Sequence, residues 1–157
     1  MPIVRWILDT NVIVSGLLSP AGPPGRLLDA ALVGTLRIVY DDRIAAEYRE
    51  VLERPALRID AGDRDAFLAV LSLHELAVVP PWTGPSPPDP DDQMFLEAVI
   101  LADEGTLVTG NLRHFPAEVR GRVTVLDPRR AWELFVRRQR LEAATLRGAG
   151  KRRKRGG

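Results

Sequence analysis

The chain has 157 residues, of which 45% are hydrophobic and 27% charged, which suits one soluble domain with a full core. It contains no cysteine, which excludes disulfides, thiolate zinc sites and cysteine nucleophiles. Any metal must therefore be held by oxygen ligands or by the two histidines, His74 and His114. No apolar run approaches the roughly 20 residues that a membrane span needs, and no secretory signal is evident, so we expect a cytoplasmic protein.

The formal net charge of +1 hides an uneven distribution. The run KRRKR at 151–155 carries five positive charges, which leaves the rest of the chain with 17 basic and 21 acidic residues. Both lysines, Lys151 and Lys154, lie in that run. A P-loop and a receiver domain each need a lysine in the folded part, so the sequence excludes both. A haloacid-dehalogenase site is excluded as well, because it needs a lysine and a second aspartate where this chain has Asn11.

The N-terminal part alternates apolar strand-like runs with amphipathic segments. Residues 3–8 predict a buried strand, and a short helix is expected at about 12–18, before the turn sequence SPAGPPG. A second helix is expected at 24–33, since proline precedes it and glycine follows it. A strand at 36–40 and a helix at 42–54, ended by the next proline, complete this part.

The same alternation continues through the C-terminal part, interrupted by a loop at 80–90 with six prolines. The pattern predicts, in chain order, a helix at 63–74, a strand at 76–80, a long helix at 90–103, strands at 106–109 and 123–126, and a helix at 128–140.

Strands that alternate with helices pair in parallel and are covered on both faces. The sequence therefore predicts an α/β fold, a three-layer α/β/α sandwich with a central, mainly parallel sheet of four to five strands. Residues 1–140 are expected to form one domain. Residues 141–157 form a basic tail that we expect to be disordered, because its end is too rich in glycine, lysine and arginine to pack.

In such sheets the ligand site lies at the carboxyl ends of the strands, near the point where strand order reverses. Asp9 directly follows the first predicted strand, and Thr109 and Asn111 follow the fourth. Asp89 and Asp92 lie at the start of the helix at 90–103. These polar residues are therefore the candidates for a functional site.

Three of the acids have an ordinary structural explanation as well. Glu47 borders the apolar stripe of its helix, where it either faces the interior or extends to solvent. Asp89 can cap its helix, and Asp92 suits the first turn of a helix dipole. Asp92 also projects toward apolar neighbours, but Asp103 projects in nearly the same direction, so the helical wheel leaves both interpretations open.

Four motifs in order resemble those of PIN-domain ribonucleases, especially the VapC-like toxins of bacterial toxin-antitoxin pairs. They are LDTNVIVSGL (8–17), the glutamate of AAEYREVL (45–52), DPDDQMFLEA (89–98) and LVTGN (107–111). The resemblance covers about residues 3–136, nearly the whole predicted domain.

This resemblance implies a metal-dependent endoribonuclease that hydrolyses RNA phosphodiester bonds. It implies catalytic roles for Asp9, Glu47 and Asp92, which would also bind one or two Mg²⁺ or Mn²⁺ ions. Asp89 and Asn111 are the further expected ligands, although the family often has an aspartate in place of Asn111, so a second metal becomes doubtful. The residues that match those supporting the site are Asn11, Ser15 and Thr109.

RNA contacts are expected at Arg113, Arg129 and Arg130, although scattered arginines are also ordinary solvated residues. The resemblance further implies a homodimer and a small cognate antitoxin protein that blocks the site. Two alternatives remain open. The protein could be a catalytically degenerate PIN-like module that binds nucleic acid or protein, with Asn111 as the sign of decay, or it could cleave DNA, since no acid reads a 2′-hydroxyl.

Overall fold

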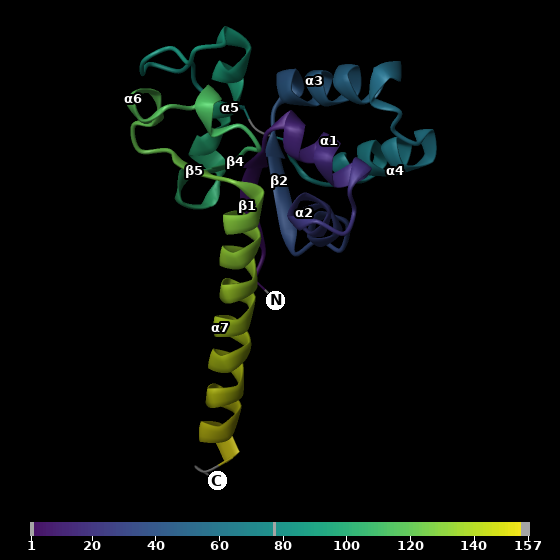
Figure 1. The fold of residues 1–157 in the computed structure, drawn as a ribbon. Coiled ribbons are helices and arrows are strands. Elements are labelled where there is room, and N and C mark those ends of the chain that lie inside the picture. The colour runs from purple at the N-terminus through teal and green to yellow at the C-terminus, as the bar shows by residue number, and fades with distance from the viewer. Residues whose placement is uncertain (1, 77, 155–157) are drawn as a thin grey trace.

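The computed structural model of the protein describes residues 2–76 and 78–154. Figure 1 shows helices on both sides of a sheet and one long helix that projects from the body. The strands are β1 (Val4–Leu8), β2 (Leu36–Tyr40), β3 (Glu75–Leu76), β4 (Thr106–Val108) and β5 (Thr124–Leu126). The α-helices are α1 (Thr10–Leu18), α2 (Pro23–Leu32), α3 (Asp42–Leu52), α4 (Ala61–Leu71), α5 (Gln93–Ala98), α6 (Ala117–Arg120) and α7 (Pro128–Lys154).

Five short 3₁₀ helices complete the structure: η1 (Pro55–Leu57), η2 (Pro90–Asp92), η3 (Val99–Leu101), η4 (Asp103–Gly105) and η5 (Leu112–His114).

The sheet has five parallel strands in the order β3-β2-β1-β4-β5. Successive strands β1, β2 and β3 extend the sheet to one side, and β4 and β5 extend it to the other. Figure 1 shows α1 to α4 on one side of the sheet and α5 and α6 on the other. The predicted α/β fold class and parallel pairing are confirmed, and the strand order reverses between β1 and β4, where a ligand site is expected.

Buried aromatic residues attach α3 and α7 to the central strand. Trp6 of β1 is fully buried and meets Phe135 of α7 edge to face, with ring centroids 6.4 Å apart. Tyr48 of α3 is also fully buried, and its hydroxyl donates a hydrogen bond to the carbonyl of Leu8 at the end of β1. The end of β1 is thus fixed against α3, the helix that carries Glu47.

Two predicted elements differ from the structure. The single helix predicted over 90–103 is wrong: η2, α5, η3 and η4 replace it, because Ala102 is extended and Glu104 has a positive φ of 53°. The strand predicted at 76–80 is β3, which covers Glu75–Leu76. Residues 78–80 are not strand, consistent with prolines at 80 and 81 that lack a donor for pairing, and residue 77 lies outside the described residues.

Helix α7 is longer than predicted, because it continues past the expected end at residue 140 to Lys154. The expectation of disorder is therefore wrong for 141–154, where alanine, leucine, arginine and glutamate favour extension of a helix already anchored on the core. Residues 155–157 lie outside the described residues. A division into a domain at 1–140 and a separate tail stays a prediction.

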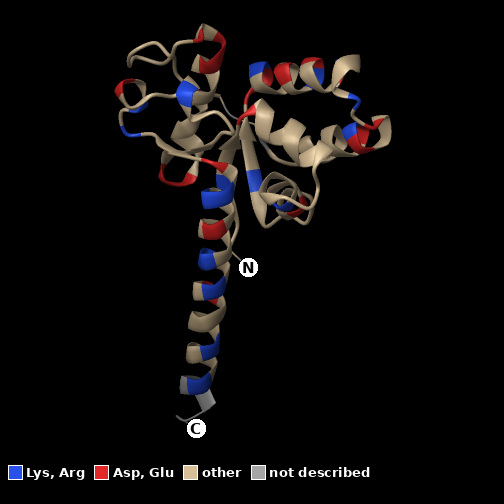
Figure 2. Cartoon of the chain, viewed as in Figure 1, with Lys and Arg blue, Asp and Glu red and all other residues tan. Residues whose placement is uncertain are grey.

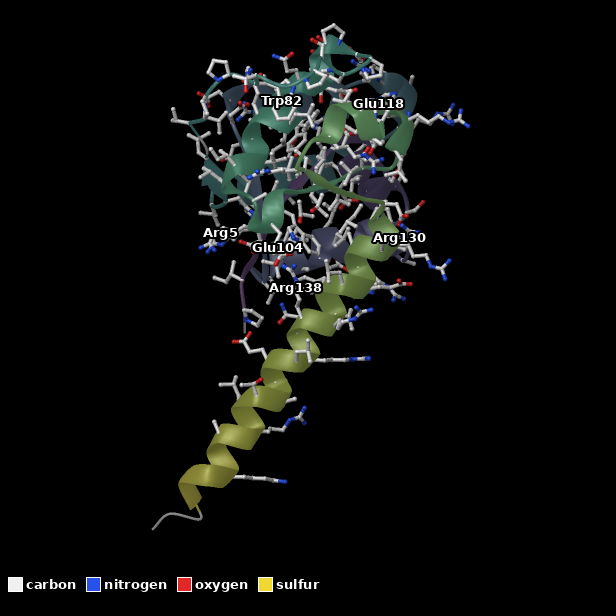
Figure 3. All side chains as sticks on the ribbon, turned by 90° about the vertical axis from the view of Figure 1, so that its left-hand side faces the viewer. Arg5, Trp82, Glu104, Glu118, Arg130 and Arg138 are labelled. Atoms are coloured by element: carbon white, nitrogen blue, oxygen red, sulfur yellow. The ribbon has the colours of Figure 1, made fainter. Side chains whose placement is uncertain are left out.

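The anchor of α7 lies in its first half. Arg138 forms an ion pair with Glu104 of η4, and its guanidinium lies 5.8 Å from the ring centroid of Trp6 (Figure 3). Gln139 Nε2 donates a hydrogen bond to the carbonyl of Pro2 at 3.1 Å. Beyond these residues, most of the helix is exposed. Among the described residues, no helix combines the length and the apolar character needed to cross a bilayer.

Removing residues 141–157 is expected to change the melting temperature by no more than about 2 °C, because the buried contacts of α7 lie before residue 141. Phe135→Ala is expected to cost about 3–5 kcal/mol, because it removes a buried ring. Thermal and urea unfolding of both variants checks this. If the truncation destabilises the protein as much as Phe135→Ala does, the stabilising contacts of α7 do not all lie before residue 141.

Candidate active site

Asp9 lies immediately after β1, at the point where the strand order reverses. Its side chain is buried, with the residue 5% exposed. It occupies the N-cap position of α1 but does not cap that helix through its side chain. Instead, Oδ2 accepts hydrogen bonds from Thr109 Oγ1 at 2.8 Å and from Asn11 Nδ2 at 3.3 Å. A buried carboxylate is therefore held between the end of β4 and the first turn of α1.

The loops after β1 and β4 are joined by hydrogen bonds around this carboxylate. Gly110 N donates to Asn11 Oδ1 at 2.9 Å, and Asn111 N donates to Thr109 Oγ1 at 3.1 Å. A Cβ atom at Gly110 would lie 3.2 Å from Asn11 Oδ1, so this close approach favours glycine. Asn11 and Thr109 thus orient Asp9, as supporting residues would.

Glu47 approaches from α3, whose N-terminus is capped by Asp41 accepting from Ile44 N at 3.0 Å. The side chain is half-buried, and Thr10, the residue after Asp9, donates its hydroxyl hydrogen bond to Glu47 Oε2. Desolvation raises the pKa of Glu47, and the negative charge of Asp9 raises it further. Glu47 is therefore held toward Thr10 and the start of α1, while its side chain stays half-buried.

Asp92 completes the group from η2, and the residue is 8% exposed. Burial raises the pKa of Asp92 to about 7, with further contributions from the charges of Asp9, Asp89 and Glu47 and an opposing one from His114. Its Oδ2 lies 3.1 Å from His114 Nδ1, yet accepts no hydrogen bond from any described residue. The structure thus places a buried carboxylate oxygen without a hydrogen-bond donor at this edge.

Mutual repulsion is the common property of these three carboxylates. Asp9 raises the pKa of both Glu47 and Asp92, although Asp9 follows β1 whereas the other two lie in α3 and η2. Within residues 2–76 and 78–154, no three acidic or histidine side chains converge closely enough to form a ready-made metal cage.

The remaining predicted metal ligands and supporting residues are less buried than Asp9 and Asp92. Asp89 is exposed and caps η2, accepting a hydrogen bond from Asp91 N at 3.0 Å. Asn111 is partly buried and lies at the end of the β4 loop, while Ser15 is exposed on α1. The structure therefore explains Asp89 as a helix cap and brings Asn111 to the correct edge, whereas Ser15 has no evident part in orienting the acids.

The arginines predicted to bind RNA are all exposed. Arg113 lies in η5, next to His114. Arg129 and Arg130 lie in the first turn of α7, where their nearest acids are Glu133 at 3.5 Å and Asp127 at 3.7 Å. These exposed ion pairs are weak and leave both guanidinium groups accessible.

Several residues that position the acids were missed by the sequence analysis. Arg43 at the start of α3 forms ion pairs with Asp41 at 2.6 Å and with the buried Glu97 of α5 at 3.4 Å. This bridge fixes α3, which bears Glu47, relative to α5, which follows Asp92. No periodic signal could have revealed it, but Thr10 could have been suspected because it directly follows Asp9.

A cleft of about 500 Å³ opens between α3 and the segment formed by η2 and α5. Glu47, Glu50 and Asp91 line it, together with Arg43 and the buried Glu97. Its acidic walls suit a cation, and its open shape gives an extended ligand access to Glu47.

Comparisons with known proteins relate this arrangement to one family. The family model described as PIN domain matches residues 5–113, more than half of the chain. The uncharacterized protein MJ1680 of Methanocaldococcus jannaschii is 26% identical over 111 residues, which cover 69% of this chain and 71% of that protein. No solved structure matches the chain.

Asp92→Asn is expected to raise the free energy of unfolding by about 1–2 kcal/mol at pH 8 in EDTA, because it removes a poorly solvated charge. Since the pKa is raised from 3.8 in the folded state, the cost to the wild-type protein begins as the pH rises above 3.8 and is complete above about pH 7. The advantage of the variant therefore shrinks as the pH falls toward 5.

Urea unfolding from pH 5 to 8 measures this, with the exposed Asp29→Asn on α2 as the matched control, expected to stay within about 0.5 kcal/mol. If the gain in free energy of unfolding from Asp92→Asn grows as the pH falls, the charge of Asp92 is not what destabilises the wild-type protein.

Proposed function

The chain belongs to the PIN-domain family, whose members are generally nucleases, and on this basis we propose that it is a metal-dependent endoribonuclease. The observation that carries the proposal is the buried Oδ2 of Asp92, which accepts no hydrogen bond from the described residues, although His114 Nδ1 lies 3.1 Å away, and whose pKa is raised by the charges of Asp9 and Glu47. Such oxygens are costly for stability and suit a hard divalent cation.

Asp9, Glu47 and Asp92 would hold the ion, with Asp89 and Asn111 as additional oxygen donors. When bound, Mg²⁺ or Mn²⁺ supplies positive charge for the attacked phosphate and a lowered pKa for its water. Asn111 adds an oxygen ligand but no negative charge, so the residues favour one ion over two.

Hydrogen bonds from neighbouring residues orient the carboxylates of Asp9 and Glu47. Thr109 and Asn11 both donate to Asp9 Oδ2, which fixes the orientation of that carboxylate. Thr10 donates to Glu47 Oε2, which leaves Oε1 to accept a hydrogen bond from the attacking water. The open cleft beside Glu47 would give a phosphodiester access to that residue once a cation offsets its acidic lining.

The VapC-like resemblance supports a further proposal, that the protein is the toxin of a toxin-antitoxin pair, forms a homodimer and is restrained by a small cognate antitoxin. Growth arrest on expression, relieved by the product of an adjacent short reading frame, tests this role. The second candidate function is a binding module without activity, which Asn111 favours because the family often has an aspartate there.

Asp9→Asn is expected to lower RNA cleavage at least about 100-fold, because it removes one negative charge and one ligand oxygen from the centre of the site. EDTA is expected to abolish cleavage by the wild-type protein, and added Mg²⁺ or Mn²⁺ to restore it. Cleavage of a labelled RNA and of a DNA of the same sequence measures both effects, with Asp29→Asn as the control.

Equal cleavage by the wild-type protein, the EDTA-treated protein and Asp9→Asn would exclude the proposed site. A silent calorimetric titration with Mn²⁺, together with no cleavage, would favour the binding module.

A further inference from the structure

The outer face of α7 carries a row of cations along the length of the helix. Arg130, Arg137, Arg140, Arg147 and Lys151 form what we term the basic stripe, and at 100° per residue they fall within an arc of about 100°. The arc lies nearly opposite the face that packs Ala131 and Phe135 into the core. Figure 2 shows basic residues recurring along the projecting part of this helix, and Figure 3 labels Arg130 at its start.

Most of the basic stripe has no acid to neutralise it. Among the described residues, Arg137, Arg140, Arg147 and Lys151 form no ion pair, and all four are exposed. Arg147 donates only to the carbonyl of Ala143, within its own helix. These four cations are therefore accessible to an anionic ligand from outside the chain.

Basic and acidic residues are also distributed unevenly between α7 with the residues after it and the rest of the chain. Residues 128–157 contain 11 basic and two acidic residues, whereas residues 1–127 contain 11 basic and 19 acidic ones. An acidic body with acidic site residues repels a polyanion, so a basic projecting helix provides the attraction that the body lacks.

A shallow hollow beside the basic stripe adds an aromatic surface. Its volume is about 460 Å³, and Trp132, Val136 and Leu141 line it together with Arg137, Arg140 and one acid, Glu133, which pairs with Arg129 at 3.5 Å. The Trp132 ring is held in place by stacking on Phe135, with centroids 5.4 Å apart and ring planes 20° apart. An aromatic ring next to guanidinium groups is the combination that binds unpaired nucleotides, by base stacking and phosphate contact.

We propose that the outer face of α7 binds single-stranded RNA, with phosphates on Arg137, Arg140, Arg147 and Lys151 and a base against Trp132. The basic stripe spans 21 residue steps, or about 32 Å, which accommodates about five nucleotides of extended strand. The inference rests on the proposed ribonuclease function, because it assigns where that enzyme holds its substrate.

The direction of α7 relates this surface to the candidate active site. The helix begins at Pro128, directly after β5, and so starts at the edge of the sheet where Asp9 follows β1. It then runs away from that edge and past the N-terminus of the chain (Figure 1). An RNA strand lying along the basic stripe is therefore led toward the edge that carries the acids.

The test measures binding without cleavage. Asp9→Asn protein in EDTA is titrated into a fluorescein-labelled, unstructured RNA of 12 nucleotides, and anisotropy is followed from 50 to 300 mM NaCl. Four phosphate contacts predict a slope of log K against log salt of about −3. Adding Arg140→Gln, Arg147→Gln and Lys151→Gln is expected to reduce that slope by about 2 and affinity at 50 mM NaCl at least about 10-fold.

A matched control removes the same charge from exposed arginines of the body. Arg26→Gln, Arg58→Gln and Arg122→Gln are expected to leave the slope unchanged. Trp132→Leu is expected to weaken binding about 10-fold without altering the slope, because stacking is not an ionic contact. Melting curves of all the variants verify that the fold is retained.

Three results would overturn the inference. The first is unchanged RNA affinity and slope in the triple variant of the basic stripe. The second is equal or tighter binding of a 12-base-pair RNA duplex. The third is a salt-sensitive dimer, seen by light scattering, that the triple variant abolishes while RNA affinity stays the same, because the stripe would then hold the acidic body of a second copy.

Failure of the proposed function gives a different result. A wild-type protein that binds RNA through the basic stripe but cleaves none, with any metal, contradicts the nuclease and supports the binding surface. If the wild-type protein cleaves RNA and the triple variant of the basic stripe cleaves it at the same rate and with the same KM, the binding surface is contradicted and the nuclease is supported.

Discussion

The hydrogen bond from Thr109 Oγ1 to Asp9 Oδ2 connects two strand ends that are 100 residues apart in sequence. It is the constraint on which the candidate site depends, because it holds a buried carboxylate at the one point where the strand order reverses. The backbone amide of Asn111 donates to the same threonine oxygen, and Asn11 bonds both Asp9 and Gly110. A single aspartate is thereby fixed by the start of α1 and the loop after β4, and its charge raises the pKa of the acids from α3 and η2.

The buried carboxylates lower the stability of the fold and create a negative potential at this edge of the sheet. Desolvation raises the pKa of Asp9, Glu47 and Asp92, and each of the latter two also feels the charge of Asp9. No described residue donates to Asp92 Oδ2. A fold gains nothing from such a group unless a cation joins it, which is why these residues suggest function rather than packing. The basic α7 supplies at a distance the positive charge that the site itself lacks.

The sequence predicts those features that follow from periodicity and topology. Alternating strands and helices predict the parallel sheet, and a parallel sheet brings the residues after β1 and β4 to one edge, so the meeting of Asp9 with Thr109 is predictable. The inward position of Glu47 is not, because it depends on the Thr10 hydroxyl, a tertiary contact. The broken helix before β4 was missed because local preference favours helix there, whereas Ala102 and Glu104 leave the helical conformation. The extension of α7 past residue 140 does not follow from composition, because it depends on the anchoring of the first turns of the helix on the core.

The most direct measurement compares Thr109→Val with Thr109→Ser for Mn²⁺ affinity by calorimetry and for RNA cleavage. Valine keeps the shape but removes the hydroxyl that orients Asp9, whereas serine retains it. The account predicts that Thr109→Val lowers both metal affinity and cleavage at least about 10-fold while the protein stays folded, and that Thr109→Ser remains close to the wild type. A Thr109→Val protein that binds Mn²⁺ and cleaves RNA as the wild type does would contradict it.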